Sequence, residues 1–175
     1  MNPFEVFGIA PGFLIDNALL RKQFLANQRR WHPDFYINDP VQHGEALRQT
    51  ALNNEAYTLL TDLYSRVKTM LMLHGYPENK ANVLPADYLM QMMELSDIIE
   101  EATAGDKSAF DEATGQLEAL QSENEQAILQ LAQQADEKAA TEGYTDEVMN
   151  SMLLLYQQHR YLSRLHKNLH GVKEL

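Results

Sequence analysis

The 175-residue sequence contains no cysteine. This absence excludes disulfide bonds, thiol catalysis and thiolate metal ligands. The sequence also has no apolar run of about eighteen residues, the length typical of a membrane-spanning helix. The first seven residues, MNPFEVF, lack the basic and apolar regions of a secretory signal. From these absences we expect a cytoplasmic protein that does not bind a membrane.

Basic residues are scarce relative to acidic ones. The chain has 14 Lys and Arg against 25 Asp and Glu, a net charge of −11. The whole acidic excess lies after residue 75, because residues 1–75 hold seven side chains of each sign. Nucleic acids are bound mainly through positive charge, so the acidic balance argues against a nucleic-acid partner. Four basic residues of the first half precede His32: Arg21, Lys22, Arg29 and Arg30. A positive patch at this position would steer a partner toward the chain.

The tripeptide His32-Pro33-Asp34 follows a helical pattern over residues 19–31. Proline fixes φ and disfavours helical geometry in the residue before it, so the helix should end near Trp31. Asp34 is then left in a loop, where its carboxylate can pair with an arginine of a partner. The alternative interpretation is an ordinary helix stop, and the helices on either side favour the binding role.

The helix before the motif is predicted to be amphipathic. Leu20, Phe24 and Trp31 share one face at helical spacing, while Lys22 and Arg29 share the opposite face. Most charged helix faces are simply solvated, and only the adjoining motif favours a binding role for this one.

The segments around this helix complete an expected antiparallel hairpin with the motif at its tip. We expect a short helix over residues 3–8, a loop over 35–43 and a second long helix over about 44–65, continuing through 66–73. Phe4, Phe7, Tyr57 and Leu60 are predicted to lie in the core.

The remainder of the sequence predicts a separate helical bundle. Residues 76–85 are predicted to be a linker, and helical patterns follow over residues 86–103, 107–141 and from Thr145 onward. In the middle helix, steps of three and four alternate along a predicted coiled-coil-like seam, which comprises Phe110, Ala113, Leu117, Leu120, Asn124, Ala127 and Leu131. No strand alternation is present, so we predict an all-α protein with domains over 1–75 and 86–175, the second a three-helix bundle.

Two apolar stripes run along the predicted helix 86–103. The first, expected to face the core, contains Tyr88, Met92, Leu95, Ile99 and Ala102. The second mixes apolar and acidic side chains: Met90, Met93, Asp97 and Glu101, flanked by Leu89 and Glu94. Methionine suits adaptable binding surfaces, and apolar patches rimmed by charge often mark protein interfaces. The alternative is that both stripes are buried, one of them against the N-terminal domain.

The N-terminal half resembles the J domain of DnaJ-type co-chaperones. The resemblance lies in the order of a helix, a His-Pro-Asp loop and a second helix that contains Asn54-Glu55-Ala56-Tyr57. The order of J domain, linker and acidic three-helix bundle resembles the HscB family of iron–sulfur cluster assembly over essentially the whole chain. The stretches that carry this resemblance are Phe4–Gly8, Leu73–Gly75 and Leu89–Leu95. One departure is Phe35, because J domains often carry Lys or Arg after the motif.

The resemblance implies two partners and no active site. The J domain would stimulate the ATPase of a heat-shock-protein-70-class, HscA-like chaperone through His32, Pro33, Asp34, Lys22, Arg29 and Arg30. The bundle would bind an IscU-like cluster scaffold protein through Leu89, Met90, Met93, Glu94, Asp97, Glu101 and Tyr161. Asp97 and Tyr161 stand where relatives carry Glu and Phe.

Two other functions compete with this one. A metal-dependent enzyme is suggested by His159, His166 and His170, which share a helix face, but positions i and i+7 lie about 10 Å apart, too far for one ion. We therefore expect no metal, no cofactor and no enzymatic activity of the chain's own. The other candidate is a J-domain co-chaperone whose bundle binds a different client protein.

Overall fold

The computed structural model describes residues 2–80 and 84–171, which are helical apart from short turns and loops and contain no strand. The predicted all-α class is thus confirmed. The chain divides into two compact units, Met1–Gly75 and Tyr76–Leu175, and each is described by itself. Among the described residues, no helix combines the length and the apolar character needed to cross a membrane.

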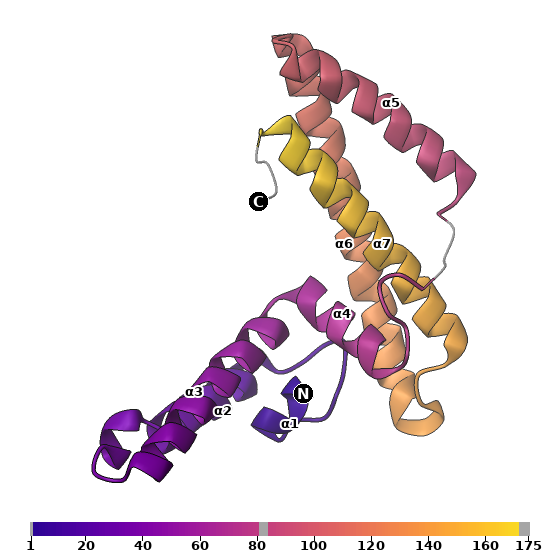
Figure 1. The fold of residues 1–175 in the computed structure, drawn as a ribbon. Coiled ribbons are helices and arrows are strands. Elements are labelled where there is room, and N and C mark those ends of the chain that lie inside the picture. Colours follow the sequence, from indigo (N-terminus) through magenta and orange to yellow (C-terminus); the bar gives the residue numbers. More distant parts are fainter. Residues whose placement is uncertain (1, 81–83, 172–175) are drawn as a thin grey trace. The chain divides into compact units, whose positions relative to one another are not determined.

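The N-terminal unit consists of α1 (Pro3–Phe7), α2 (Asn17–Arg30), the 3-10 helix η1 (Pro33–Tyr36), α3 (Pro40–Thr61) and α4 (Leu63–Leu73). Helices α2 and α3 lie side by side and are joined at one end by η1 (Figure 1). The side chains that fill the core come from every α-helix and the loop after α1: Phe4, Phe7, Phe13, Leu20, Ala56, Leu60, Val67 and Met70. Burial of these apolar surfaces supplies most of the stability of the hairpin.

The second long helix begins earlier than the sequence pattern indicated. We predicted a loop over residues 35–43, but α3 starts at Pro40 and η1 occupies Pro33–Tyr36. The Asp39 carboxylate accepts hydrogen bonds from the backbone N–H groups of Val41 and Gln42, at 3.0 and 3.1 Å. Proline is favoured at the first helical position because its missing N–H has no partner there. Asp39-Pro40 is therefore a helix start rather than loop punctuation.

A buried arginine joins three parts of the N-terminal unit. Arg66 on α4 is only 6% exposed, and its Nε donates a hydrogen bond of 2.7 Å to the carbonyl of Phe13. Its Nη1 donates to the carbonyl of Leu60, near the end of α3. Such bonds offset the cost of removing a charged group from water. Arg66 thereby fixes α4 to the loop before α2 and to the end of α3.

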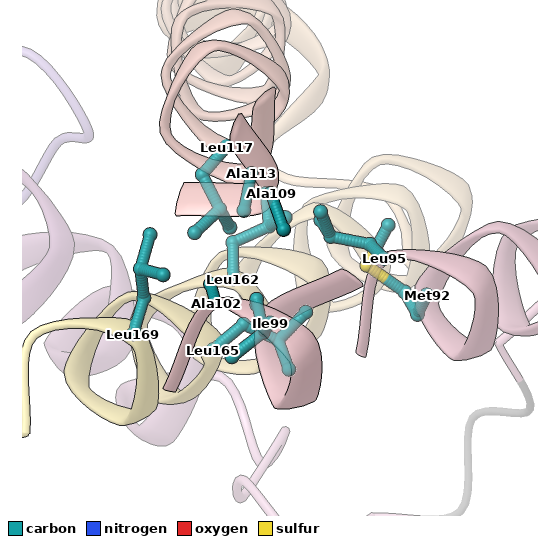
Figure 2. Packing of buried hydrophobic residues seen from close by; sticks show 10 residues of the cluster. All are labelled: Met92, Leu95, Ile99, Ala102, Ala109, Ala113, Leu117, Leu162, Leu165 and Leu169. Carbon is teal, nitrogen blue, oxygen red and sulfur yellow. The ribbon is translucent and has the colours of Figure 1, made fainter. Parts of the chain in front are cut away.

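The C-terminal unit is the predicted three-helix bundle, formed by α5 (Ala86–Thr103), α6 (Lys107–Glu142) and α7 (Asp146–Leu169). Figure 2 shows its core near the α5–α6 turn, where side chains of all three helices point toward one another. Met92, Leu95, Ile99 and Ala102 supply the α5 part, as the first apolar stripe predicted. Tyr88, the remaining member of that stripe, is partly buried at the edge of the cluster.

The buried face of α6 departs from the predicted seam at both ends. Ala113, Leu117 and Asn124 are buried as expected, but beyond them the buried side chains are Ile128, Ala132 and Ala135. The other four seam residues are only partly buried: Phe110, Leu120, Ala127 and Leu131. A straight helix has 3.6 residues per turn, so a strict seven-residue repeat drifts by about 20° per heptad. Over 36 residues of α6 that drift moves the buried face by one position.

Residues 76–80 lie against α7 and belong to the bundle's packing. Tyr76 is 6% exposed, and its hydroxyl donates a hydrogen bond to the Asp146 carboxylate. Glu78 forms an ion pair with Arg160 on α7, with 2.8 Å between Oε2 and Nη1. We call residues 76–80 the strap. They form the first half of the predicted linker 76–85, of which residues 81–83 lie outside the described part of the chain.

Candidate functional site

The His-Pro-Asp motif forms the turn between α2 and α3. His32 has extended backbone geometry, with φ −65° and ψ 122°, and Pro33 begins η1. The His32 and Asp34 side chains are 53% and 81% exposed, with 3.7 Å between Nδ1 and the nearer carboxylate oxygen. His32 Nδ1 also lies 3.4 Å from the backbone N–H of Asp34. The imidazole and the carboxylate are therefore presented together to solvent.

Polar side chains of α3 and η1 hold the end of α2 in place beneath the motif. Thr50 donates a hydrogen bond of 3.0 Å to the carbonyl of Trp31, and Tyr36 donates one of 2.9 Å to that of Arg30. Asn53, only 2% exposed, donates to the Phe24 carbonyl at 3.2 Å. Carbonyls at a helix end lack partners within the helix, so the bonds from Thr50 and Tyr36 stabilise the end of α2. The bond from Asn53 joins α3 to an inner turn of the same helix. Sequence reasoning missed Thr50 and Asn53, because nothing local shows which polar residues of α3 face α2.

The basic residues before the motif are exposed. Lys22, Arg29 and Arg30 all lie on the solvent side of α2. The Arg30 guanidinium lies 5.1 Å from the centre of the Trp31 ring, a cation–π contact that orients it beside the motif. The face predicted for Lys22 and Arg29 is thus solvent-accessible and adjoins His32.

A second candidate surface lies on α5, opposite the core stripe. We call it the methionine face, and it comprises Leu89, Met90, Met93, Glu94, Asp97 and Glu101, all exposed. Met90 and Met93 are 64% and 66% exposed, and Leu89 is 37% exposed. Neither α6 nor α7 covers this face, because α5 packs on them through Met92, Leu95, Ile99 and Ala102.

The methionine face carries a strong negative charge. Helix α5 holds five acidic side chains and no basic one: Asp87, Glu94, Asp97, Glu100 and Glu101. Three of them surround the exposed methionines. A flexible apolar centre with an acidic rim is suited to a partner surface that is apolar and basic.

Tyr161 occupies a different position from the other residues predicted to share its surface. It is partly buried on α7 and packs against the bundle core, with the Arg164 guanidinium 4.5 Å from its ring centre. Burial raises the pKa of its neighbour Tyr88 to about 12, with a further contribution from Tyr161. Tyr161 therefore lies between α5 and α7, where it both supports the core and borders α5.

The histidines of α7 do not gather into a metal site. The rings of His166 and His170 lie 4.3 Å apart, whereas His159 contacts Ser163, with 3.3 Å between Nε2 and Oγ. Over residues 2–80 and 84–171, no three His, Asp or Glu side chains lie where they could hold one ion together.

Curated proteins with similar sequences show the family of this chain. A co-chaperone protein HscB homolog from Shewanella baltica (strain OS223) is 31% identical over 180 residues, covering 99% of this chain and 98% of the relative. The homolog from Vibrio cholerae serotype O1 is 38% identical over 107 residues, 59% of this chain and 63% of that relative. No protein-family model matches the chain.

Solved structures show the same architecture. Chaperone HscB from Vibrio cholerae is 26% identical, has a TM-score of 0.66, and the similarity covers 98% of this chain and 97% of that one. The human co-chaperone protein HscB has a TM-score of 0.67 at 21% identity, over 98% and 81% of the two chains, and supports the fold alone. With its exposed His-Pro-Asp turn, its acidic three-helix bundle and a full-length relative, this chain belongs to the HscB family of co-chaperones.

Proposed function

We propose that the chain binds an iron–sulfur cluster scaffold protein, delivers it to a specialised heat-shock-protein-70-class chaperone and stimulates that chaperone's ATPase. The scaffold is expected to be IscU-like and the chaperone HscA-like, as the resemblance implies. A cytoplasmic location and a role in the maturation of iron–sulfur proteins are parts of the same proposal.

The exposed motif turn is the observation that carries the chaperone half of the proposal. His32 and Asp34 project side by side into solvent, and α3 fixes the helix end below them. A co-chaperone of this kind needs no reacting groups of its own. It accelerates hydrolysis by binding the hydrolysis-competent state of the chaperone more tightly than the resting state. The exposed basic side chains of Lys22, Arg29 and Arg30 would favour approach to an acidic chaperone surface.

The methionine face supports the scaffold half. Its exposed apolar centre gives a partner the kind of anchor that dominates interface energetics, and its carboxylates select a basic partner. Tyr161 extends this surface from α5 onto α7 in the proposal. A different client protein remains the alternative, and it would use the same face.

The chaperone ATPase assay tests this function. We expect wild-type protein to raise the steady-state ATPase rate, and His32→Gln or Asp34→Asn to abolish the increase. Both side chains are exposed, so the free energy of unfolding should change by no more than about 0.5 kcal/mol. Equal stimulation by wild type and a folded His32→Gln variant would refute the chaperone half. Addition of the scaffold protein should raise the ATPase rate further. If an unrelated client protein raised the rate and the scaffold did not, the result would support the alternative client.

A further inference from the structure

Three large apolar side chains stand in solvent directly after the His-Pro-Asp motif. Phe35 is 74% exposed, Ile37 is 69% exposed and Val41 is 81% exposed. All three lie within seven residues: Phe35 in η1, Ile37 directly after it and Val41 in the first turn of α3. We call them the apolar tip. Exposed apolar residues are common singly, but three within seven residues beside the exposed His-Pro-Asp motif indicate an interaction surface.

The local geometry leaves Phe35 unused by the fold. Its neighbour Tyr36 packs back onto α2, where its hydroxyl bonds to Arg30 and its ring lies 6.1 Å from that of Trp31. Phe35 contributes its backbone, because its N–H donates a hydrogen bond of 3.0 Å to the His32 carbonyl. Its ring remains largely in solvent. Of these two adjacent aromatic residues, one stabilises the turn and the other is presented outward.

Phe35 is also continuous with the motif. Its ring centre lies 5.6 Å from that of His32, and the two planes are tilted by 52°. A partner that binds the exposed faces of His32 and Asp34 therefore has Phe35 within reach. The exposed basic side chains of Arg29 and Arg30 lie on the α2 side of the same turn. The surface thus combines a polar motif, positive charge and an apolar tip.

We propose that Phe35, supported by Ile37 and Val41, is a specificity-determining anchor that enters an apolar recess of the chaperone beside the surface that binds the motif. This inference rests on the proposed function, because it takes the heat-shock-protein-70-class chaperone as the occupant. It adds a second contact of different chemistry to the His-Pro-Asp motif.

The identity of residue 35 would then select among chaperones. A Lys or Arg at this position, as many J domains carry, needs an acidic or solvated surface opposite. Phe35 needs an apolar recess. If a chaperone has a carboxylate at that place, the Phe35 ring would remove the carboxylate from water without giving it a positively charged partner. Specificity of this kind arises from the mismatch with the wrong partner as much as from the fit with the right one.

The test is a titration of chaperone ATPase rate against co-chaperone concentration. Phe35→Ala and Phe35→Lys should raise the half-maximal concentration at least about 10-fold, the loss typical of a truncated interface anchor. The rate at saturation should stay near that of wild type, because His32 and Asp34 are intact. Met72→Ala, which truncates a 58% exposed side chain on α4, is the matched control and should change the half-maximal concentration less than 2-fold.

A second chaperone of the same class, whose own J-domain partner carries Lys or Arg after the motif, tests specificity. Phe35→Lys should weaken stimulation of the first chaperone and strengthen or preserve that of the second. An unchanged half-maximal concentration for both Phe35 variants would overturn the anchor, provided that His32→Gln still abolishes stimulation. If His32→Gln has no effect either, the proposed function fails first.

The alternative occupant of the apolar tip is a second copy of the chain. Sedimentation of the full chain should give a monomer at the concentrations of the assay. A dimer that Phe35→Ala dissociates would show that a second copy occupies the tip, and the proposal would be wrong. Circular dichroism and urea unfolding should show wild-type folding for Phe35→Ala and Phe35→Lys, since the ring makes little buried contact.

Discussion

The hydroxyl of Tyr76 donates a hydrogen bond to the carboxylate of Asp146, 70 residues further along the chain. Tyr76 is the first residue of the C-terminal unit and Asp146 is the first residue of α7. Asp146 also lies at the positive end of the helix dipole, which stabilises its charge. The hydrogen bond to Asp146 raises the pKa of Tyr76, and burial raises it further. The strap is therefore fixed to α7 from its first residue.

Removing this bond should loosen the strap without unfolding the bundle. We expect Tyr76→Phe to lower the thermal midpoint of the bundle and to speed amide hydrogen exchange in residues 76–80. Asp146→Asn should have a smaller effect, because the amide still accepts a hydrogen bond. Trp31 is the sole tryptophan and lies in the other unit, so its fluorescence provides an internal control. Wild-type exchange in Tyr76→Phe would show that the bond does not hold the strap.

Ionisation of Tyr88 should destabilise the bundle at high pH. The pKa of Tyr88 is about 12 in the folded chain, above its usual 10, so folding favours the neutral phenol. The associated stability is fully present below pH 10 and is lost as the pH rises toward 12. Because the ring is partly exposed, we expect a contribution of roughly 1 kcal/mol rather than the full value of a two-unit shift.

Urea unfolding followed by circular dichroism measures this effect. Between pH 9 and pH 11.5, wild type should lose about 1 kcal/mol more than Tyr88→Phe. Tyr88→Phe lacks the ionisable hydroxyl, so the difference between the two proteins reports the ionisation of Tyr88. Parallel losses in the two proteins would mean that Tyr88 titrates in the folded state as it does in the unfolded state.

Local sequence patterns predicted the fold class, the helix pairings and the two faces of α5. Proline after His32 and the periodicity of Leu20 and Phe24 are strong local signals, and the structure follows them. The heptad pattern failed toward both ends of α6, because helical drift accumulates with length and only the neighbouring helices determine the buried face. The start of α3 was misplaced because Asp39-Pro40 is equally typical of a turn and of a helix start.

Tertiary contacts could not be predicted in the same way. The role of Thr50 depends on its position opposite the end of α2, and that of Tyr76 on a carboxylate 70 residues away. Exposure of Phe35 is also a tertiary property, since the sequence does not distinguish it from the adjacent Tyr36, whose ring packs on Trp31. The predicted binding residues Lys22 and Met93 are exposed, as their helix faces indicated.

Electrostatic steering by α2 should make chaperone stimulation dependent on salt. Lys22→Glu and Arg29→Glu should each raise the half-maximal concentration, and wild-type stimulation should weaken as salt increases. Exposed charges are screened beyond about 8 Å at physiological ionic strength, so the effect should be largest at low salt. Arg48→Glu makes the same change of charge outside α2 and serves as the control, since Arg48 lies on α3 and is already paired with Glu45. Salt-independent titrations with unchanged midpoints would mean that the basic face is only solvated.

The methionine face should carry most of the scaffold affinity. We expect Leu89→Ala combined with Met93→Ala to cost about 2 kcal/mol or more of binding free energy, measured by calorimetry. Leu129→Ala, which truncates a similarly exposed leucine on α6, should leave binding unchanged. Adding Tyr161→Ala should weaken binding further but also reduce bundle stability, because that ring packs on the core. A folded double variant with wild-type affinity would remove the scaffold assignment of this face.

Delivery of the scaffold requires both surfaces on one molecule, and a mixing experiment tests this most directly. Asp34→Asn should bind scaffold without stimulating the chaperone, whereas the Leu89→Ala and Met93→Ala double variant should stimulate without responding to scaffold. We expect an equimolar mixture of the two to show the basal stimulation of the double variant and no scaffold-dependent increase beyond that of scaffold alone. Restoration of the wild-type, scaffold-dependent rate by the mixture would contradict delivery by a single chain.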